Sequence, residues 1–386
     1  MELQEYFKSM VEMEASDLYL TVARPVMFRV DGKIRAAGDH VFSPPELVTL
    51  AQSIMNEKQR REFAETMEMN FATSLPGVAR FRVNIFQQRG SVGMVIRRIK
   101  ADVMSVSELG LPSILNDIVM TKRGLVLVVG ATGSGKSTSL AAMVDYRNSH
   151  EAGHIITIED PIEFVHRHKK SIVTQREVGF DTHSFQAALK NTLRQAPDVI
   201  LIGEIRDTET MEAALTFAET GHLCLGTLHS NNANQAIERI MNFFQIERHA
   251  QFYLQLSLNL RAIVSQRLIP SPDGKRVAAL EILMDTPRIR DLIRKGDVDI
   301  LKEAMEQGIQ EGCQTFDQAL FNLYKDGLIS LEQALINADS TNNLRLKIKL
   351  AGLKVDEEPT QAEKPVEDKG RPEPLQVAGG FRLRKS

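Results

Sequence analysis

Residues 130–137 read GATGSGKS and fit the pattern G-x-x-x-x-G-K-[S/T] of a phosphate-binding loop. In such a loop the backbone N–H groups cradle phosphate oxygens, the lysine reaches the β- and γ-phosphates, and the serine hydroxyl binds Mg²⁺. The loop follows the apolar run 125–129 and precedes a predicted helix, which is the context that the motif requires. We therefore expect ATP and Mg²⁺ to bind here. The residues predicted to contact the nucleotide are Gly130, Thr132, Gly133, Ser134, Gly135, Lys136, Ser137 and Thr138.

Two acidic segments follow apolar runs further along the chain. The run 199–202 leads through Gly203 to Glu204, which we predict to lie near Mg²⁺ together with Ser137. Residues 158–164 read IEDPIEF, and Glu163 is the predicted general base that orients the attacking water. Glu159 and Asp160 are alternatives for holding metal-bound water or positioning this loop. A solvated acidic loop is the other interpretation, but ligands bind at the carboxyl ends of strands in α/β sheets.

A histidine stands at each end of the apolar run 223–228. His229 follows the run, at the end where the other candidate residues are expected, so we predict that it senses the γ-phosphate. His222 precedes the run, at the opposite end. It is a weaker candidate for direct involvement in the site, and a purely structural role is the alternative.

Four arginines lie on or beside a predicted hairpin near the N-terminus: Arg80, Arg82, Arg97 and Arg98. A guanidinium stabilises the charge that develops during phosphoryl transfer, and ring ATPases often take this group from a neighbouring subunit. We select Arg82 and Arg97 as candidates, with a solvated strand face as the alternative.

Residues 1–100 are predicted to form a small α/β unit. Its expected elements are strands at 18–22 and 25–30, a helix at 45–63, and a hairpin formed by 81–86 and 92–99. Residues 101–123 are expected to be a linker with a short helix at 113–120.

From residue 124 onward, strands and helices alternate. Apolar runs at 125–129, 155–158, 199–202 and 223–228 are separated by predicted helices at 137–148, 184–195 and 208–220. Such alternation indicates a mostly parallel sheet covered by helices. A hairpin at 263–269 and 277–283 and helices between 287 and 350 complete the expected unit at 124–350.

Composition limits the remaining possibilities. The chain has 47 Lys and Arg against 50 Asp and Glu, a net charge of −3, which gives no support to a nucleic-acid partner. Its two cysteines form no C-x-x-C pair, so a zinc ribbon is excluded. We see no apolar run of about 20 residues and no signal peptide, so we expect a cytoplasmic protein, peripheral to a membrane at most. The proline-rich charged segment 355–386 is expected to be a disordered tail.

The four motifs, in this order, resemble the secretion and type IV pilus ATPase superfamily over residues 1 to about 350. Within it the chain resembles the type IV pilus retraction ATPases of the PilT/PilU family, through the short N-terminal region with ASDL at 15–18 and GVARFRV at 77–83. The segment 288–295, RIRDLIRK, is similar to that family's AIRNLIRE. Ala131, the segment 230–235 and the charged tail favour the PilU group.

The resemblance implies a RecA-like ATPase domain preceded by a PAS-like domain. It also implies a homohexameric ring that docks at the cytoplasmic face of the inner membrane against a pilus platform protein, with a paralogous retraction ATPase as a further partner. Its implied function is ATP-driven pilus retraction and twitching motility. An accessory nucleotide-binding ring, an assembly or secretion ATPase, and a nucleic-acid motor are the alternatives.

Overall fold

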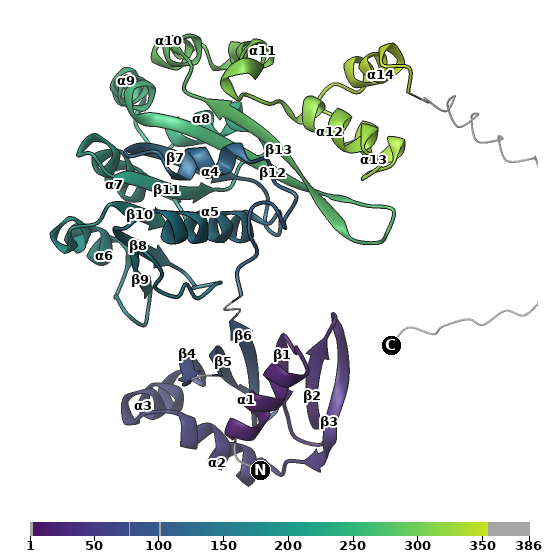
Figure 1. The fold of residues 1–386 in the computed structure, drawn as a ribbon. Coiled ribbons are helices and arrows are strands. Elements are labelled where there is room, and N and C mark those ends of the chain that lie inside the picture. The colour runs from purple at the N-terminus through teal and green to yellow at the C-terminus, as the bar shows by residue number, and fades with distance from the viewer. Residues whose placement is uncertain (1–2, 77, 100–101, 354–386) are drawn as a thin grey trace, which may run out of the picture.

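The computed structural model describes residues 3–76, 78–99 and 102–353 and contains two separate sheets (Figure 1). The expected tail at 355–386 lies outside the described residues. A six-stranded sheet is built from the N-terminal part of the chain and a seven-stranded sheet from the part after residue 123. In the view of Figure 1 the smaller unit lies below the larger one, and β6 leads up toward it.

The N-terminal sheet is antiparallel, in the order β3-β2-β1-β6-β5-β4. One face packs on helices, and the rings of Phe7 and Phe81 stack there with centroids 4.1 Å apart. The elements are α1 (Leu3–Glu12), β1 (Asp17–Leu20), β2 (Pro25–Val30), β3 (Lys33–Val41), α2 (Pro44–Ile54), α3 (Glu57–Thr66), β4 (Glu68–Leu75), β5 (Ala79–Gln88) and β6 (Ser91–Ile99).

The predicted helix at 45–63 is wrong in one respect, because it is two helices. Met55 adopts an extended conformation with ψ of 137°, and Asn56 then caps α3 by accepting a hydrogen bond from the Gln59 N–H. An asparagine inside a helical pattern competes for backbone donors and favours a new helix start. The strand predicted at 18–22 ends at Leu20, since Ala23 takes a left-handed φ of 60° and turns the chain.

The larger sheet has the order β13-β12-β7-β11-β10-β8-β9, and every neighbouring pair is parallel except the β12–β13 hairpin. Its strands are β7 (Gly124–Val129), β8 (His154–Glu159), β9 (Ile172–Glu177), β10 (Val199–Ile202), β11 (Leu223–Leu228), β12 (Leu260–Pro270) and β13 (Arg276–Met284). The four buried apolar runs became the central parallel strands, as predicted. The edge strand β9 is an addition, because its polar residues carry no strong strand signal.

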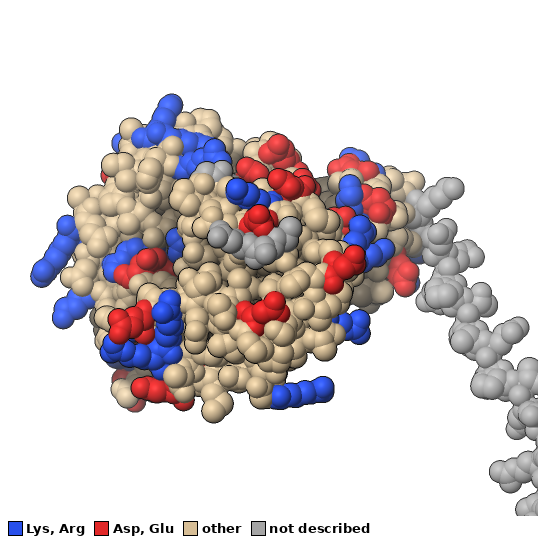
Figure 2. All heavy atoms as spheres, turned by 90° about the horizontal axis from the view of Figure 1, so that it is seen from below, with Lys and Arg blue, Asp and Glu red and all other residues tan. Residues whose placement is uncertain are grey.

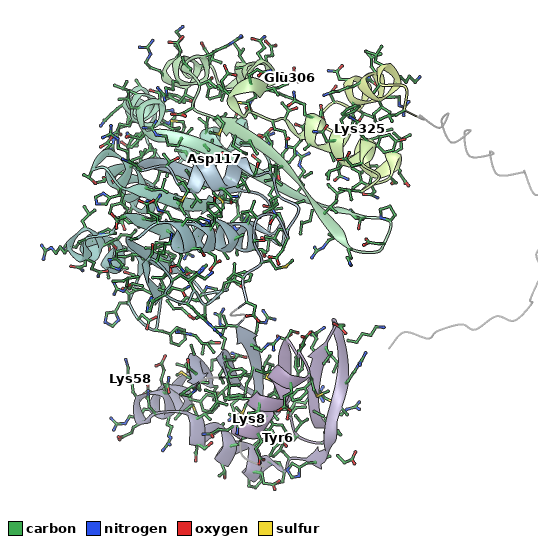
Figure 3. The ribbon with its side chains drawn as sticks, in the orientation of Figure 1. Tyr6, Lys8, Lys58, Asp117, Glu306 and Lys325 are labelled. Carbon is green, nitrogen blue, oxygen red and sulfur yellow. The ribbon has the colours of Figure 1, made fainter. Side chains whose placement is uncertain are left out.

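Helices cover both faces of this sheet. Leu115 and Met143, from α4 (Ile114–Val119) and α5 (Lys136–His150), pack against Val126 and Val128 of β7. Asp117, labelled in Figure 3, marks α4 in front of the sheet. The other face packs against α6 (Phe185–Thr192), α7 (Thr208–Glu219), α8 (Ala233–Met241) and α9 (His249–Asn259). The unit is therefore a three-layer α/β sandwich.

Between the hairpin and residue 353 the chain forms the α-helices α10 (Pro287–Lys295), α11 (Leu301–Gln307), α12 (Phe316–Lys325), α13 (Leu331–Asn337) and α14 (Thr341–Leu350). Figure 2 shows the molecule from below, and on that face basic and acidic side chains are intermixed between wide uncharged areas. Within the part of the chain that the structure describes, no helix is long and apolar enough to cross a membrane.

Candidate functional site

Most of the predicted site residues meet in a cleft at the carboxyl ends of the central strands. The cleft has a volume of about 620 Å³ and is bounded by residues of both units. Its lining comprises Ser16, Arg97, Arg98, Thr132, Gly133, Gly135, Lys136, Ser137, Thr138, Leu140, Ala141, Thr157, Glu159, Asp160, Pro161, Glu163, Phe164, His166, Leu201, Gly203, Glu204, Thr227, His229, Leu268 and Arg276. Ligands of α/β proteins bind in the crevice just beyond the carboxyl ends of the parallel strands.

The phosphate-binding loop connects β7 to α5. Gly133 and Gly135 have left-handed φ values of 77° and 90°, which favour glycine. The Lys136 ammonium is buried and donates hydrogen bonds to the carbonyls of Gly130 at 2.8 Å and Ala131 at 3.0 Å. Burial lowers the pKa of Lys136, and the nearby Glu204 carboxylate opposes this shift. Gly130 and Ser134 belong to the loop and are buried, but they do not line the cleft.

Gln266 of β12 contacts the loop at Gly135 and the start of α5 at Ser139, and the sequence did not reveal this. Its Oε1 accepts a hydrogen bond from the Ser139 hydroxyl at 2.7 Å, across 127 positions of the chain. A Cβ on Gly135 would lie 2.7 Å from Gln266 Nε2, so the Gln266 side chain would have to shift, and the φ of 90° also favours glycine. This contact depends on which strands are neighbours, and a single sequence carries no signal for that pairing.

Glu204 and His229 lie at the ends of β10 and β11, with Glu204 Oε1 and His229 Nε2 3.5 Å apart. The Thr227 hydroxyl donates to the carbonyl of Gly203, which ties the two strand ends together. His222 lies at the opposite end of β11, where its ring contacts the Thr220 hydroxyl at 3.1 Å. His222 is therefore not brought to the cleft.

The acidic segment after β8 places its three carboxylates differently. Glu163 is exposed and lines the cleft. Glu159 accepts hydrogen bonds from the Thr157 hydroxyl at 2.6 Å and from Gln175 Nε2 at 3.1 Å. Burial raises the pKa of Glu159, and these bonds oppose that shift. Asp160 forms an ion pair with Arg206 at 3.0 Å.

The arginines of the N-terminal sheet divide into two groups. Arg97 and Arg98 line the cleft, and the Arg97 Nε donates to Asp17 Oδ1 at 2.8 Å. This bond raises the pKa of Arg97, with a further contribution from the Glu163 carboxylate. Arg82 lies directly opposite Arg97 across β5 and β6 but does not line the cleft. Arg80 instead faces Glu177 of β9.

The cleft offers a magnesium ion few protein ligands. Among the described residues no group of three or more His, Cys, Asp or Glu side chains could hold a metal. The Ser137 hydroxyl and the Glu204 carboxylate both line the cleft. Mg²⁺ in nucleotide sites prefers one or two such oxygens together with phosphates and water. This donor set fits Mg²⁺ bound with a nucleotide.

Sequence reasoning missed several lining residues, including Phe164, His166 and Arg276. His166 is half-buried, and burial lowers its pKa from 6.5 to about 4. Its position three residues after Glu163 was the one available signal. Arg276 reaches the cleft from β13, and only the paired hairpin brings it there.

The fold and the cleft define a P-loop ATPase with a RecA-like sheet and a smaller PAS-like α/β unit before it. Residues 2–333 match the model of the protein family described as "Type II/IV secretion system protein", and the chain belongs to this family.

Relatives with assigned names are close. The chain is 57% identical to the type IV pilus ATPase PilU of Pseudomonas aeruginosa, over 91% of this chain and 92% of the relative. It is 46% identical to the type IV pilus retraction ATPase PilT of the same organism, over 89% of this chain and 100% of that relative. A twitching motility protein of Neisseria gonorrhoeae is 43% identical over 87% of this chain and 90% of that relative. The resemblance to this family is thus confirmed, and the protein is an ATPase.

Solved structures agree. The crystal structure of the pilus retraction motor PilT with bound ADP superposes with a TM-score of 0.83 at 45% identity, covering 89% of this chain and 98% of the other. The ATPase DotB of Legionella pneumophila gives a TM-score of 0.73 at 27% identity, covering 91% and 95%. These likenesses support the predicted fold class and nucleotide binding.

Proposed function

We propose that this protein hydrolyses ATP to power or assist type IV pilus retraction, and so twitching motility. The observation that carries the proposal is the convergence of Lys136, Glu163, Glu204 and His229 in one cleft that also contains Arg97 of the N-terminal unit. The names of the closely similar PilU and PilT proteins support the pilus role.

Each residue has a proposed part in hydrolysis. The loop backbone and Lys136 hold the β- and γ-phosphates, and the exposed Glu163 carboxylate accepts a proton from the attacking water. Ser137 and Glu204 hold Mg²⁺, which neutralises charge on the phosphates when it is bound. His229, beside Glu204, senses the γ-phosphate. Arg97, and less directly Arg82, stabilise developing charge.

Hydrolysis is coupled to movement through the cleft itself. Because the γ-phosphate is contacted from both units before hydrolysis and is absent afterward, its loss shifts one unit relative to the other. We propose that six copies form a ring at the cytoplasmic face of the inner membrane. There the ring acts on a pilus platform protein, with a paralogous retraction ATPase as a further partner and no nucleic acid.

The first test is steady-state ATP hydrolysis by the purified protein, with and without Mg²⁺. Lys136→Ala and Glu163→Gln should each lower kcat by at least about a hundredfold, because each removes a group used in the transition state. Nucleotide binding should survive in Glu163→Gln and weaken in Lys136→Ala. Turnover that persists in Glu163→Gln would contradict the role of this carboxylate.

The accessory-ring alternative predicts a different outcome in cells. In that case Glu163→Gln would leave pilus retraction unchanged when the paralogous motor is present, although the protein is still required. An assembly or secretion role would appear as loss of surface pili rather than loss of their retraction. Measuring pilus number and retraction force in the same variant separates these alternatives.

A further inference from the structure

Glu163 is exposed in the cleft, and within the described residues its carboxylate receives no hydrogen bond that would fix it. Its placement therefore depends on the backbone of residues 159–166, the segment that begins at the last residue of β8 and leads toward β9. A general base must lie within hydrogen-bond reach of the proton that it takes, and a displacement of about 1 Å can cost about a hundredfold in rate. Whatever fixes this segment thus controls the position of the base.

Gln175 of β9 makes three hydrogen bonds to this segment. Its Nε2 donates to Glu159 Oε1 at 3.1 Å and to the carbonyl of Phe164 at 2.8 Å. Its Oε1 accepts from the backbone N–H of His166 at 2.8 Å. The carboxamide orientation is unambiguous, because the His166 N–H can only donate and the Phe164 carbonyl can only accept.

Glu159 extends the same network toward Glu163. Its carboxylate also accepts from the Thr157 hydroxyl at 2.6 Å, and the backbone of Glu163 opposes the rise in the pKa of Glu159 that burial causes. Gln175 thus holds the segment before Glu163 through Glu159 and after Glu163 through Phe164 and His166. A side chain on a paired strand of the sheet is a firmer support than the loop alone.

We propose that Gln175 is a positioning residue for ATP hydrolysis, whose carboxamide fixes residues 159–166 so that the Glu163 carboxylate lies in the cleft with the phosphate-binding loop. This role rests on the proposed function of Glu163 as the base. Gln175 does not line the cleft, and its three hydrogen bonds go to Glu159, Phe164 and His166 rather than to the phosphate-binding loop or Glu204. Its loss should therefore slow the chemical step without weakening nucleotide binding.

The test compares kcat with nucleotide affinity in the full-length protein. Gln175→Met keeps the length of the side chain but removes all three hydrogen bonds, and Gln175→Glu replaces the two donors by a carboxylate facing Glu159. Both should lower kcat about 10- to 100-fold, while the Kd of a fluorescent ADP analogue changes by less than about threefold. Thr174→Val is the matched control on the same strand, because it removes only the contact with His154 at 2.9 Å. The control should keep the kcat of the original protein.

An exchange of the two partners distinguishes positioning from general support of the fold. In the double variant Glu159→Gln with Gln175→Glu, an amide again faces a carboxylate, although the donor to the Phe164 carbonyl stays lost, so kcat should recover in part, by at least about fivefold over Gln175→Glu alone. Unchanged kcat in Gln175→Met, or a loss fully explained by a smaller fraction of protein that binds ADP, would overturn the proposal.

Glu163→Gln is assayed in parallel to separate the two levels of the argument. If Glu163→Gln abolishes turnover but Gln175→Met does not lower kcat, the positioning role fails and the base remains. If Glu163→Gln still turns over, the role of the base fails first, and with it the reason for positioning it.

Discussion

Gly135 combines a backbone requirement with a close contact at the phosphate-binding loop. Its φ is 90°, and a Cβ there would lie 2.7 Å from Gln266 Nε2. We expect Gly135→Ala to weaken ATP binding at least about tenfold, because the strained loop loses the cradle of N–H groups. Gly274→Ala is the control, since Gly274 has φ of 79° with open space around it. Gly274→Ala should lower the stability of the protein without changing its affinity for ADP. An equal loss of ADP affinity in Gly135→Ala and Gly274→Ala would refute a specific role of the loop geometry.

His166 makes stability depend on pH. Burial lowers its pKa from 6.5 to about 4, so between these values the unfolded chain binds more protons than the folded one. The free energy of unfolding should therefore fall as pH falls from 6.5 toward 4, with a loss from this group on the order of 2 kcal/mol by pH 5. Asp145 and Lys169 also act on this ring and partly oppose each other.

Urea unfolding at pH 7.5 and pH 5 measures this dependence. His166→Asn should lack this part of the pH dependence, whereas His183→Asn, at an exposed histidine, should retain it. An identical fall in stability for the original protein and for His166→Asn would assign the acid sensitivity to other groups.

The sequence placed the central strands and the residues that follow them, because buried parallel strands are continuous apolar runs and phosphate loops have fixed spacing. For this reason the sequence patterns could predict the site residues Lys136, Glu163, Glu204 and His229. Gln175 could not be predicted in this way, because its strand has polar residues at four of six positions and lies at the sheet edge. Gln266 and Arg276 reach the site because β12 pairs with the distant strand β7, and local patterns do not encode that pairing.

At the scale of elements, β5 and β9 connect the two units through one ion pair. Arg80 Nη2 lies 3.6 Å from Glu177 Oε2, and the Glu177 side chain is 1% exposed. Burial raises the pKa of Glu177, while Arg80 and Arg82 oppose the shift. Removing one partner of a buried pair leaves an uncompensated charge and typically costs about 3 kcal/mol, whereas replacing both can be nearly neutral.

We therefore expect Arg80→Leu to destabilise the protein by about 3 kcal/mol, and Arg80→Leu with Glu177→Leu to lie within about 1 kcal/mol of the original. The measurement is a double-mutant cycle from urea unfolding. Arg61→Leu is the control, because its ion pair with Glu57 is exposed on α3. Additive losses in the cycle would mean that the pair does not couple the two strands.

At the scale of the whole molecule, the decisive question is whether each copy supplies its own arginine. Arg97 and Glu163 line the same cleft of one chain, and the Glu163 carboxylate contributes to the raised pKa of Arg97. Asp17 holds the Arg97 guanidinium by its Nε, which leaves the other nitrogens able to bind an anion. This geometry favours an arginine that acts within its own chain.

Mixing two inactive proteins tests this arrangement in the proposed ring. Arg97→Ala and Glu163→Gln should each lower kcat, by about a thousandfold for an arginine that stabilises the transferring phosphate. If Arg97 serves its own chain, no cleft in a mixed ring contains both groups, and the mixture should show only the sum of the two residual activities. Exchange of subunits is verified by labelling one protein and isolating rings that contain both. Turnover above that sum would instead mean that Arg97 completes the cleft of a neighbour, because an Arg97→Ala copy with an intact Glu163 would then borrow the arginine of a Glu163→Gln copy. The mixed ring thus decides whether one copy can hydrolyse ATP with its own arginine or needs the N-terminal unit of the neighbouring copy.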